Sequence, residues 1–307
     1  MKIAIIAVIA VLILTVAGYF LFMKGSFDIF ERPQSEEQTE TETATSTQEQ
    51  REDQSQEVKD DTKTVIGKSV QNHDITAYHF GTGEEELLFI GGIHGGYSWN
   101  TTLVAYELMD YLERNPSEIP QNIKVTVIPV MNPDGLEKVT GTTTRFALSD
   151  VPQALSERVP GRYNGNTVDL NRNFDCEWKQ EGVWQNTKVS GGTAVFSEPE
   201  SRAVRDYVNA HTPAGVVVWY SAAGGVFSSS CKNGVSDKTL ALTTEYAQAS
   251  GYRPYKEFNF YEITGDMVNW FAKENIPAIS VLLTNHEDVE WEKNLKGIKA
   301  LFAHYAE

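Results

Sequence analysis

Short apolar segments alternate with longer amphipathic segments along most of the chain, and this alternation limits the possible folds more than any other feature. The apolar segments have the length and the β-branched content of strands that are covered on both faces, and they span residues 87–92, 124–130, 215–221 and 276–284. Helical patterns occupy residues 100–115, 198–211, 238–250, 265–275 and 288–307. Strands that alternate with helices predict an α/β domain with a mostly parallel sheet.

The amino terminus carries a different signal. Residues 3–23 contain no charged side chain and are almost entirely apolar. At about 1.5 Å per residue a helix of this length spans about 30 Å, the thickness of a bilayer's hydrocarbon core. A cleaved signal peptide has a shorter apolar region, of about 7–15 residues. We therefore expect residues 1–24 to be a single-pass membrane anchor and the rest of the chain to lie on the extracytoplasmic side.

The next segment is acidic and has few apolar side chains. Residues 31–63 contain no aromatic residue, so they cannot bury enough apolar surface to offset the entropy of ordering. We expect residues 25–63 to form a disordered tether and residues 64–307 to form the folded domain. The formal net charge of −16 argues against nucleic acid or an anionic membrane surface as a partner.

The chain has two cysteines, Cys176 and Cys231. An exported domain with two cysteines is a candidate for one disulfide, because disulfides persist in oxidising compartments. The sequence does not give the distance between the two residues, so the bridged and the free forms are both open.

Polar residues follow the predicted strands. His94 comes after residues 87–92 within the stretch GGIHGG, and Asn132, Tyr220 and Thr284 lie at or just past the ends of the other strands. Ligands of such sheets bind outside the carboxyl ends of the strands. We therefore expect these residues to line one pocket.

Three short motifs carry further information. MNPDG, residues 131–135, is typical of a turn after a strand. FSEPESRAV, residues 196–204, predicts a helix start with Ser197 as N-cap. NTVDLNRNFD, residues 166–175, places an arginine between two asparagines, an arrangement that suits a bidentate grip on a carboxylate.

Together and in this order, the motifs NPDG, VDLNRNF and SEPE resemble the zinc carboxypeptidase family, especially the bacterial branch that includes murein peptide amidases. The resemblance covers residues 87–292. It implies a three-layer α/β/α fold around a mixed, mostly parallel eight-stranded sheet. It also implies an ancestral activity, the hydrolysis of a peptide's carboxyl end by a zinc-bound water.

The resemblance assigns the metal and general-base positions to residues that are mostly unsuited to them. The first zinc histidine matches His94. The carboxylate ligand falls on Tyr97 or Ser98, the second histidine on Tyr220 and the general base on Leu282. A catalytic zinc needs about three protein ligands, so we expect no resident cofactor, or zinc held only weakly, and no intact catalytic residue.

The substrate-holding positions are better kept. The pair that grips the terminal carboxylate matches Asn171 and Arg172. The resemblance also assigns the oxyanion arginine to Arg162, with Arg145 as the alternative, the closing tyrosine to Tyr261 and the side-chain contact to Asn269.

These assignments leave three hypotheses. The first is a pseudoenzyme that binds a peptide or a murein stem peptide by its free terminal carboxylate. The second is an active metallopeptidase with a displaced zinc site, in which His286 joins His94 with Asp175 or Glu262 as a further ligand. The third is a purely structural envelope domain whose pocket is closed by side chains.

Overall fold

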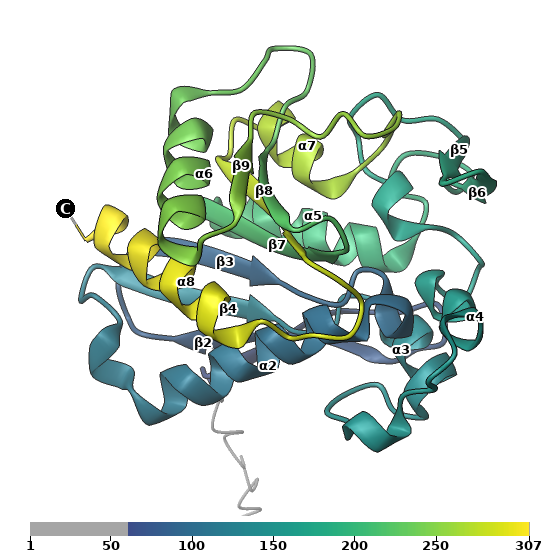
Figure 1. The fold of residues 1–307 in the computed structure, drawn as a ribbon, viewed down its shortest axis with the longest axis horizontal. Helices are drawn as coiled ribbons and strands as arrows, with labels where there is room; N and C mark the ends of the chain where they lie inside the picture. The colour runs from purple at the N-terminus through teal and green to yellow at the C-terminus, as the bar shows by residue number, and fades with distance from the viewer. Residues whose placement is uncertain (1–60, 307) are drawn as a thin grey trace, which may run out of the picture. The chain divides into compact units, whose positions relative to one another are not determined.

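The computed structural model describes residues 61–306, and a sheet of eight strands runs through them (Figure 1). The strand order is β1-β2-β4-β3-β7-β10-β8-β9. The strands are β1 (Lys63–Lys68), β2 (Asp74–Phe80), β3 (Glu85–Ile90), β4 (Ile123–Ile128), β7 (Gly215–Ser221), β8 (Gly225–Ser228), β9 (Arg253–Tyr255) and β10 (Ala278–Leu283). The neighbours β4, β3, β7 and β10 are parallel to one another, as are β8 and β9, whereas β1–β2, β2–β4 and β10–β8 are antiparallel.

The four strands predicted from apolar runs are the four parallel strands at the centre of the sheet, β4, β3, β7 and β10. The sequence did not indicate β1, β2, β8 or β9. These outer strands contain polar or exposed residues, as the half-exposed Val65 in β1 illustrates, and β9 has only three residues. The first of them begins at Lys63, one residue before the expected start of the domain.

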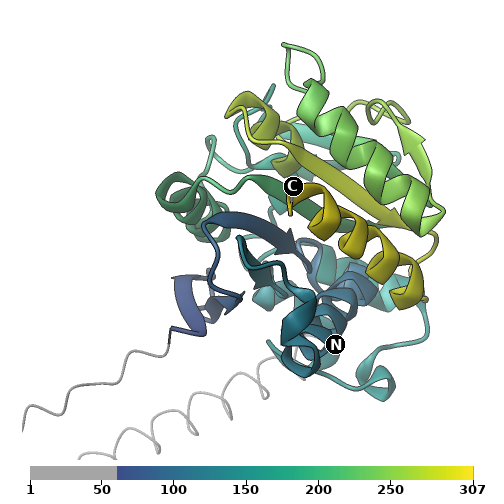
Figure 2. The ribbon, with the colours of Figure 1, turned by 90° about the vertical axis from the view of Figure 1, so that its left-hand side faces the viewer.

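Helices cover both faces of the sheet (Figures 1 and 2). The helices α2 (Trp99–Arg114), α6 (Asp237–Ser250) and α8 (Trp291–Tyr305) share one apolar core with the sheet, and α5 (Pro199–His211) and α7 (Met267–Lys273) share the other. Alternate strand residues enter opposite cores, so Leu87 and Phe89 lie in the first and Leu88 and Ile90 in the second. The fold is therefore the predicted α/β/α arrangement.

Two local expectations were wrong. The NPDG motif does not form a simple turn, because Pro133 begins the helix α3 (Pro133–Thr140). The side chain of Asn132 caps this helix by accepting a hydrogen bond from the Gly135 N–H at 2.9 Å. The N-cap of α5 is Glu198 rather than Ser197, and Pro199 is its first helical residue. In both cases proline sits at the first helical position, where its missing N–H costs nothing.

A small hairpin lies beside the main sheet. Its strands are β5 (Glu181–Trp184) and β6 (Thr187–Ser190). The base of the hairpin is joined to the VDLNRNF motif, because the Asp169 N–H donates to the Ser190 carbonyl at 3.0 Å. The short helix α4 (Leu155–Arg158) precedes that motif. The hairpin was not predicted, because its mostly exposed residues form no apolar run.

The two cysteines are joined. A disulfide links Cys176 to Cys231 with a Cα–Cα distance of 6.0 Å. It connects the segment after the VDLNRNF motif to the segment after β8. The bridge decides the question that the sequence left open.

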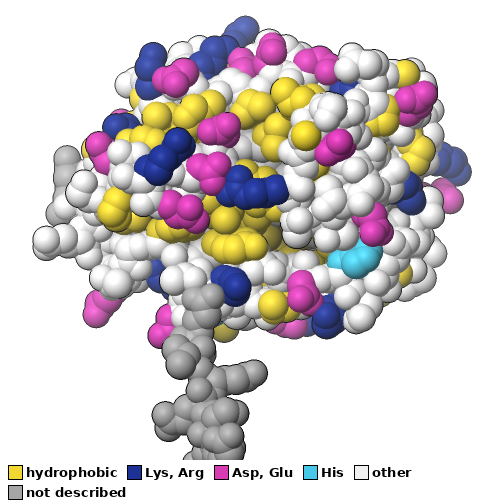
Figure 3. Space-filling view, turned by 90° about the horizontal axis from the view of Figure 1, so that it is seen from below, with side chains coloured by type: hydrophobic (Ala, Val, Ile, Leu, Met, Phe, Trp, Pro, Cys, Tyr) yellow, Lys and Arg dark blue, Asp and Glu magenta, His cyan; other side chains and the backbone are white. Residues whose placement is uncertain are grey.

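The predicted anchor and most of the predicted tether lie outside the described residues. Within residues 61–306, no helix is both long and apolar enough to cross a membrane. On the face seen from below, acidic and basic side chains are mixed around an apolar region rather than gathered by sign (Figure 3).

Candidate functional site

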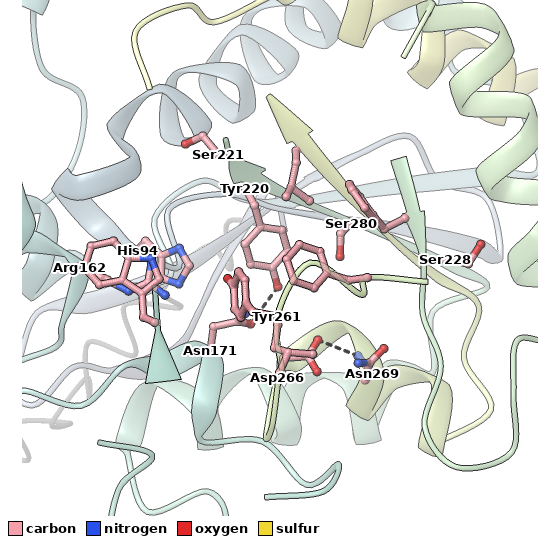
Figure 4. A pocket seen from close by; sticks show the side chains of 15 residues that line it. His94, Arg162, Asn171, Tyr220, Ser221, Ser228, Tyr261, Asp266, Asn269 and Ser280 are labelled. Carbon is pink, nitrogen blue, oxygen red and sulfur yellow. Dashed lines mark hydrogen bonds between the residues drawn. The ribbon is translucent and has the colours of Figure 1, made fainter. Parts of the chain in front are cut away.

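A small pocket lies at the carboxyl ends of the central parallel strands (Figure 4). β7 contributes Tyr220 and β10 contributes Leu282, which are paired in register. The pocket has a volume of about 70 Å³. Its lining includes His94, Arg162, Asn171, Trp184, Tyr220, Phe227, Phe258, Tyr261, Asp266, Asn269 and Leu282. The prediction of a pocket at this edge of the sheet is therefore confirmed for His94 and Tyr220, whereas Asn132 caps α3 and Thr284 hydrogen-bonds to Glu290.

The loop between β3 and α2 turns sharply to place His94. Gly92 has a φ of +66°, and a Cβ there would lie 2.7 Å from Thr102 Oγ1, so glycine is required. The imidazole of His94 is buried, with Nε2 3.4 Å from Asp169 Oδ1. Burial, followed by the charge of Arg162, lowers the pKa of His94 to about 4. The ring is therefore neutral at physiological pH.

A buried ion pair stands next to this histidine. Arg162 donates from Nε at 3.1 Å and from Nη2 at 2.7 Å to Asp169 Oδ2. Burial alone would raise the pKa of Asp169, but Arg162 and then His94 hold it well below its usual range. The charge of Arg162 is thus balanced within the protein. Arg145, the alternative for the oxyanion position, does not line the pocket and pairs with Asp110 instead.

The two residues of the predicted carboxylate grip are separated. Asn171 lines the pocket, and its Oδ1 accepts hydrogen bonds from the Tyr220 hydroxyl at 3.0 Å and from the Met267 N–H at 3.2 Å. Arg172 does not line the pocket. Its fully buried guanidinium donates from Nη1 to the Asn171 carbonyl at 2.9 Å and from Nη2 to the Val183 carbonyl at 3.2 Å. In this conformation Arg172 supports the β5–β6 hairpin.

Aromatic side chains close the side of the pocket near Arg162. The Trp184 ring lies 4.4 Å from the Arg162 guanidinium carbon and meets the ring of Tyr97 edge-on at 5.1 Å. Tyr97 also packs on His286, with 4.7 Å between ring centroids. Burial raises the pKa of Tyr97, so its hydroxyl remains protonated. Tyr97 is a packing residue here, and the hairpin residue Trp184 is a pocket residue that the sequence analysis missed.

The other predicted metal and base positions have no acidic or imidazole group. Burial raises the pKa of Tyr220 well above its usual value, so the hydroxyl acts as a hydrogen-bond donor to Asn171. Ser98 is buried, and its Oγ has no hydrogen-bond partner among the described residues. Leu282 presents only an apolar side chain to the pocket.

The donor chemistry of the site does not fit a resident zinc ion. Within residues 61–306, no three His, Cys, Asp or Glu side chains are grouped so that they could hold a metal. His286 forms a hydrogen-bond contact from Nδ1 to Ser221 Oγ at 3.1 Å. Asp175 pairs with Lys273 and Glu262 pairs with Lys179, each at 2.6 Å. The residues of the displaced-site hypothesis are therefore committed to other contacts.

The opposite end of the pocket contains Tyr261, Asn269 and Asp266 (Figure 4). Tyr261 is 39% exposed and packs on Phe258. Asn269 lines the pocket as predicted, although its Oδ1 accepts from the Ser230 N–H at 2.8 Å. Asp266, which the sequence analysis missed, is the N-cap of α7 and is only 5% exposed. The helical pattern predicted for residues 265–275 includes Asp266, whereas α7 begins one residue after it, at Met267.

The fold and the pocket define a carboxypeptidase-like α/β domain, and comparison with known proteins gives the family. The chain belongs to the zinc carboxypeptidase family, whose model matches residues 49–288.

Two curated relatives illustrate the sequence similarity. Carboxypeptidase B of Helicoverpa zea is 30% identical over 155 residues, which are 47% of this chain and 34% of that protein. Human carboxypeptidase D is 31% identical over 128 residues, 38% of this chain and 8% of that protein. The matched part of this chain thus spans about a third or less of the length of these two relatives.

Two solved structures illustrate the similarity of fold. Carboxypeptidase A of Helicoverpa armigera aligns with a TM-score of 0.63 at 20% identity, covering 80% of this chain and 68% of that one. The murein-tripeptide amidase of Escherichia coli O157 aligns with a TM-score of 0.54 at 20% identity, covering 78% and 91%. At this level of identity the similarity establishes the fold alone.

Proposed function

We propose that this protein is a membrane-anchored pseudoenzyme of the zinc carboxypeptidase family that binds the free carboxyl terminus of a peptide, such as a murein stem peptide. One observation carries the proposal. The pocket retains hydrogen-bond donors for a carboxylate, while Tyr220 and Leu282 occupy the strand ends to which the resemblance assigns a zinc ligand and the general base.

The chemistry of these two positions supports the loss of hydrolysis. A catalytic zinc needs about three protein ligands and an open position, and a protonated tyrosine is a poor ligand. Without the metal, no bound water has its pKa lowered toward about 7. Leu282 has no group that can accept a proton, so general-base catalysis has no candidate at that position.

The hydrogen bonds of the pocket support carboxylate binding. Arg162 uses Nε and Nη2 for Asp169, and no residue among 61–306 accepts a hydrogen bond from its Nη1. Asn171 uses only its Oδ1, so its Nδ2 is likewise uncommitted within that range. Tyr261 adds a hydroxyl at the exposed edge. Arg172 then acts indirectly, by holding the hairpin that carries Trp184.

Export of the domain is part of the proposal. Residues 3–23 have the length and composition of a membrane-spanning helix. The disulfide between Cys176 and Cys231 supports an oxidising compartment. Residues 25–63 would then tether the domain to the membrane.

Titration of one peptide in its free-acid and amidated forms tests the binding function. A charge-assisted hydrogen bond contributes roughly 1.5–3 kcal/mol, so one or two of them together with a pocket for the side chain support a dissociation constant of about millimolar to micromolar. We expect the full-length chain to bind the free acid and not the amide. Arg162→Lys keeps a charge for Asp169 but lacks the uncommitted Nη1, so it should weaken binding, whereas Arg145→Lys should not. Tyr261→Phe should weaken binding less than Arg162→Lys.

Equal affinity for the two peptide forms, or no binding of either at millimolar concentration, would favour a purely structural domain instead. Zinc content is measured in parallel on the same protein after dialysis at neutral pH. We expect no tightly held zinc. One retained zinc per chain together with peptide hydrolysis would refute the pseudoenzyme and support the active, displaced-site alternative.

A further inference from the structure

The pocket is smaller than the ligand that we propose for it. Its volume is about 70 Å³. A cavity of about 150 Å³ holds one benzene molecule, and the carboxyl-terminal residue of a peptide, unless it is glycine, has at least as many non-hydrogen atoms as benzene. One wall of the pocket must therefore move before the terminal residue can enter completely.

Two walls of the pocket are held firmly. Tyr220 and Leu282 lie in the buried central strands β7 and β10. The wall that precedes α7 is held by backbone hydrogen bonds, because the Phe174 N–H donates to the Gly265 carbonyl at 2.8 Å and the Gly265 N–H donates to the Cys176 carbonyl at 2.7 Å. The disulfide fixes Cys176 in turn. Movement of either wall would disrupt the sheet or this bonded segment.

The β5–β6 hairpin, residues 181–190, forms a wall that is attached more loosely. It contributes Trp184 to the pocket and lies at the margin of the domain (Figure 1). Most of its residues are exposed, and none of them belongs to either apolar core of the described domain. A two-stranded hairpin is marginally stable by itself. Its position therefore depends on its contacts with the rest of the domain.

The base of the hairpin is fixed and can serve as a hinge. The Gly191 N–H donates to the Gln180 carbonyl at 2.8 Å, and the Asp169 N–H donates to the Ser190 carbonyl at 3.0 Å. Gly192 follows the hairpin with a φ of +86°, and glycine places little steric restriction on backbone rotation. The two strands beyond the base can therefore swing together without separating from each other.

Farther from the base, one arginine holds the hairpin against the domain. Arg172 Nη2 donates to the Val183 carbonyl at 3.2 Å, and a Cβ at Gly182 would lie 3.1 Å from Arg172 Cδ. The guanidinium is fully buried, its Nε has no hydrogen-bond partner among residues 61–306, and no acidic residue in that range forms an ion pair with it. Burial of a charge without a counter-ion is costly. The arrangement seen here is therefore held by a weak latch.

We propose that the β5–β6 hairpin is a lid, with Arg172 as its latch and its hinge at Gln180 and Gly191, and that it swings away from the pocket to admit the ligand. The inference rests on the proposed function, because the size of the peptide's terminal residue requires the opening. Opening moves Trp184 away from Arg162, whose guanidinium carbon lies 4.4 Å from the indole ring in the closed position. The terminal carboxylate can then reach Arg162.

The distance between two spin labels on the full-length chain measures the position of the lid. Thr187→Cys places one label at the exposed tip of the hairpin, and Lys296→Cys places the other on the exposed face of α8. The native cysteines are bridged, so only the two new thiols react with the label. We expect saturating free-acid peptide to change the most populated distance. A distance distribution that is the same with and without bound peptide overturns the inference.

Weakening the latch tests the same inference through affinity. Gly182→Ala places a methyl group against Arg172 and so disfavours the closed lid. The apparent affinity scales with the fraction of molecules that are competent to bind, so this variant should bind the free-acid peptide about threefold to tenfold more tightly. Arg172→Met removes the hydrogen bond to Val183 and should also strengthen binding. Thr187→Ala, at the exposed tip of the lid, is the matched control and should leave the affinity unchanged.

The outcomes separate this inference from the proposed function. Binding of the free-acid peptide by the wild-type chain, with unchanged or weaker binding by Gly182→Ala and Arg172→Met, overturns the lid and leaves the proposed function standing. No binding by the wild-type chain or by either variant at millimolar concentration overturns both.

Discussion

Burial of Asp266 has a consequence for stability that can be measured without a ligand. Its pKa in the folded protein is about 6, compared with an ordinary value of 3.8. The difference corresponds to about 3 kcal/mol of free energy that opposes folding once the group is ionised. Replacing the carboxylate with an amide of the same shape removes this term. Asp266→Asn should therefore make the protein more stable at neutral pH.

The sign of the effect sets its pH dependence. A raised carboxyl pKa means that the folded state binds more protons than the unfolded state between pH 3.8 and about 6. The contribution of the protonated Asp266 carboxyl to the free energy of unfolding is fully present below pH 3.8 and is lost as the pH rises to about 6. The Asn variant has no such loss. The difference in unfolding free energy should be near zero at pH 3.5 and reach about 3 kcal/mol at pH 7.

Urea unfolding, followed by tryptophan fluorescence at several pH values, measures this difference on the full-length chain. Asp61→Asn, at an exposed position distant in sequence from Asp266, is the control and should change the unfolding free energy little at any pH. The reasoning would be refuted by an Asp266→Asn variant that matches the wild type at pH 7. A gain of equal size at pH 3.5 and pH 7 would also refute it, because such a gain cannot come from ionisation.

Two further predictions concern the metal positions and the disulfide. Ser98→Glu combined with Tyr220→His supplies two zinc ligands beside His94, so zinc analysis should detect binding in this double variant. Adding Leu282→Glu should give slow peptide hydrolysis. A double variant that binds no zinc would mean that the pocket cannot accommodate a metal. Replacing Cys176 and Cys231 with serine should lower the unfolding free energy by about 4 kcal/mol for the 55-residue separation, and an unchanged urea midpoint would contradict this chain-entropy argument.

The parts of the fold that sequence predicts well are those fixed by local pattern. Strands β3, β4, β7 and β10 are continuous apolar runs, and the amphipathic helices between them show a clear period. His94 and Tyr220 were placed at the pocket because parallel strands end at the same edge of the sheet. These features depend on residues that are close in sequence.

The missed features depend on tertiary contacts. The position of Arg172 follows from the Val183 carbonyl in a hairpin that has no apolar pattern. Asp266 lines one pocket with residues from β8 and β10, such as Phe227 and Leu282. Its burial therefore depends on elements that a local sequence pattern does not bring together. A sequence motif identifies the residue types that could bind a carboxylate, but not which of them faces the pocket.

The order of the strands also separates β1, the first strand of the described domain, from the strands that line the pocket. β1 is the outermost strand of the sheet and is hydrogen-bonded only to β2, and β4 lies between β2 and β3. Gly67 in β1 lies directly against Ala203 of α5. A mechanical pull transmitted through the preceding residues would therefore load the β1–β2 ladder first. Force applied there would therefore separate β1 from β2 before it reached β7, β8 and β10, the strands whose residues line the pocket.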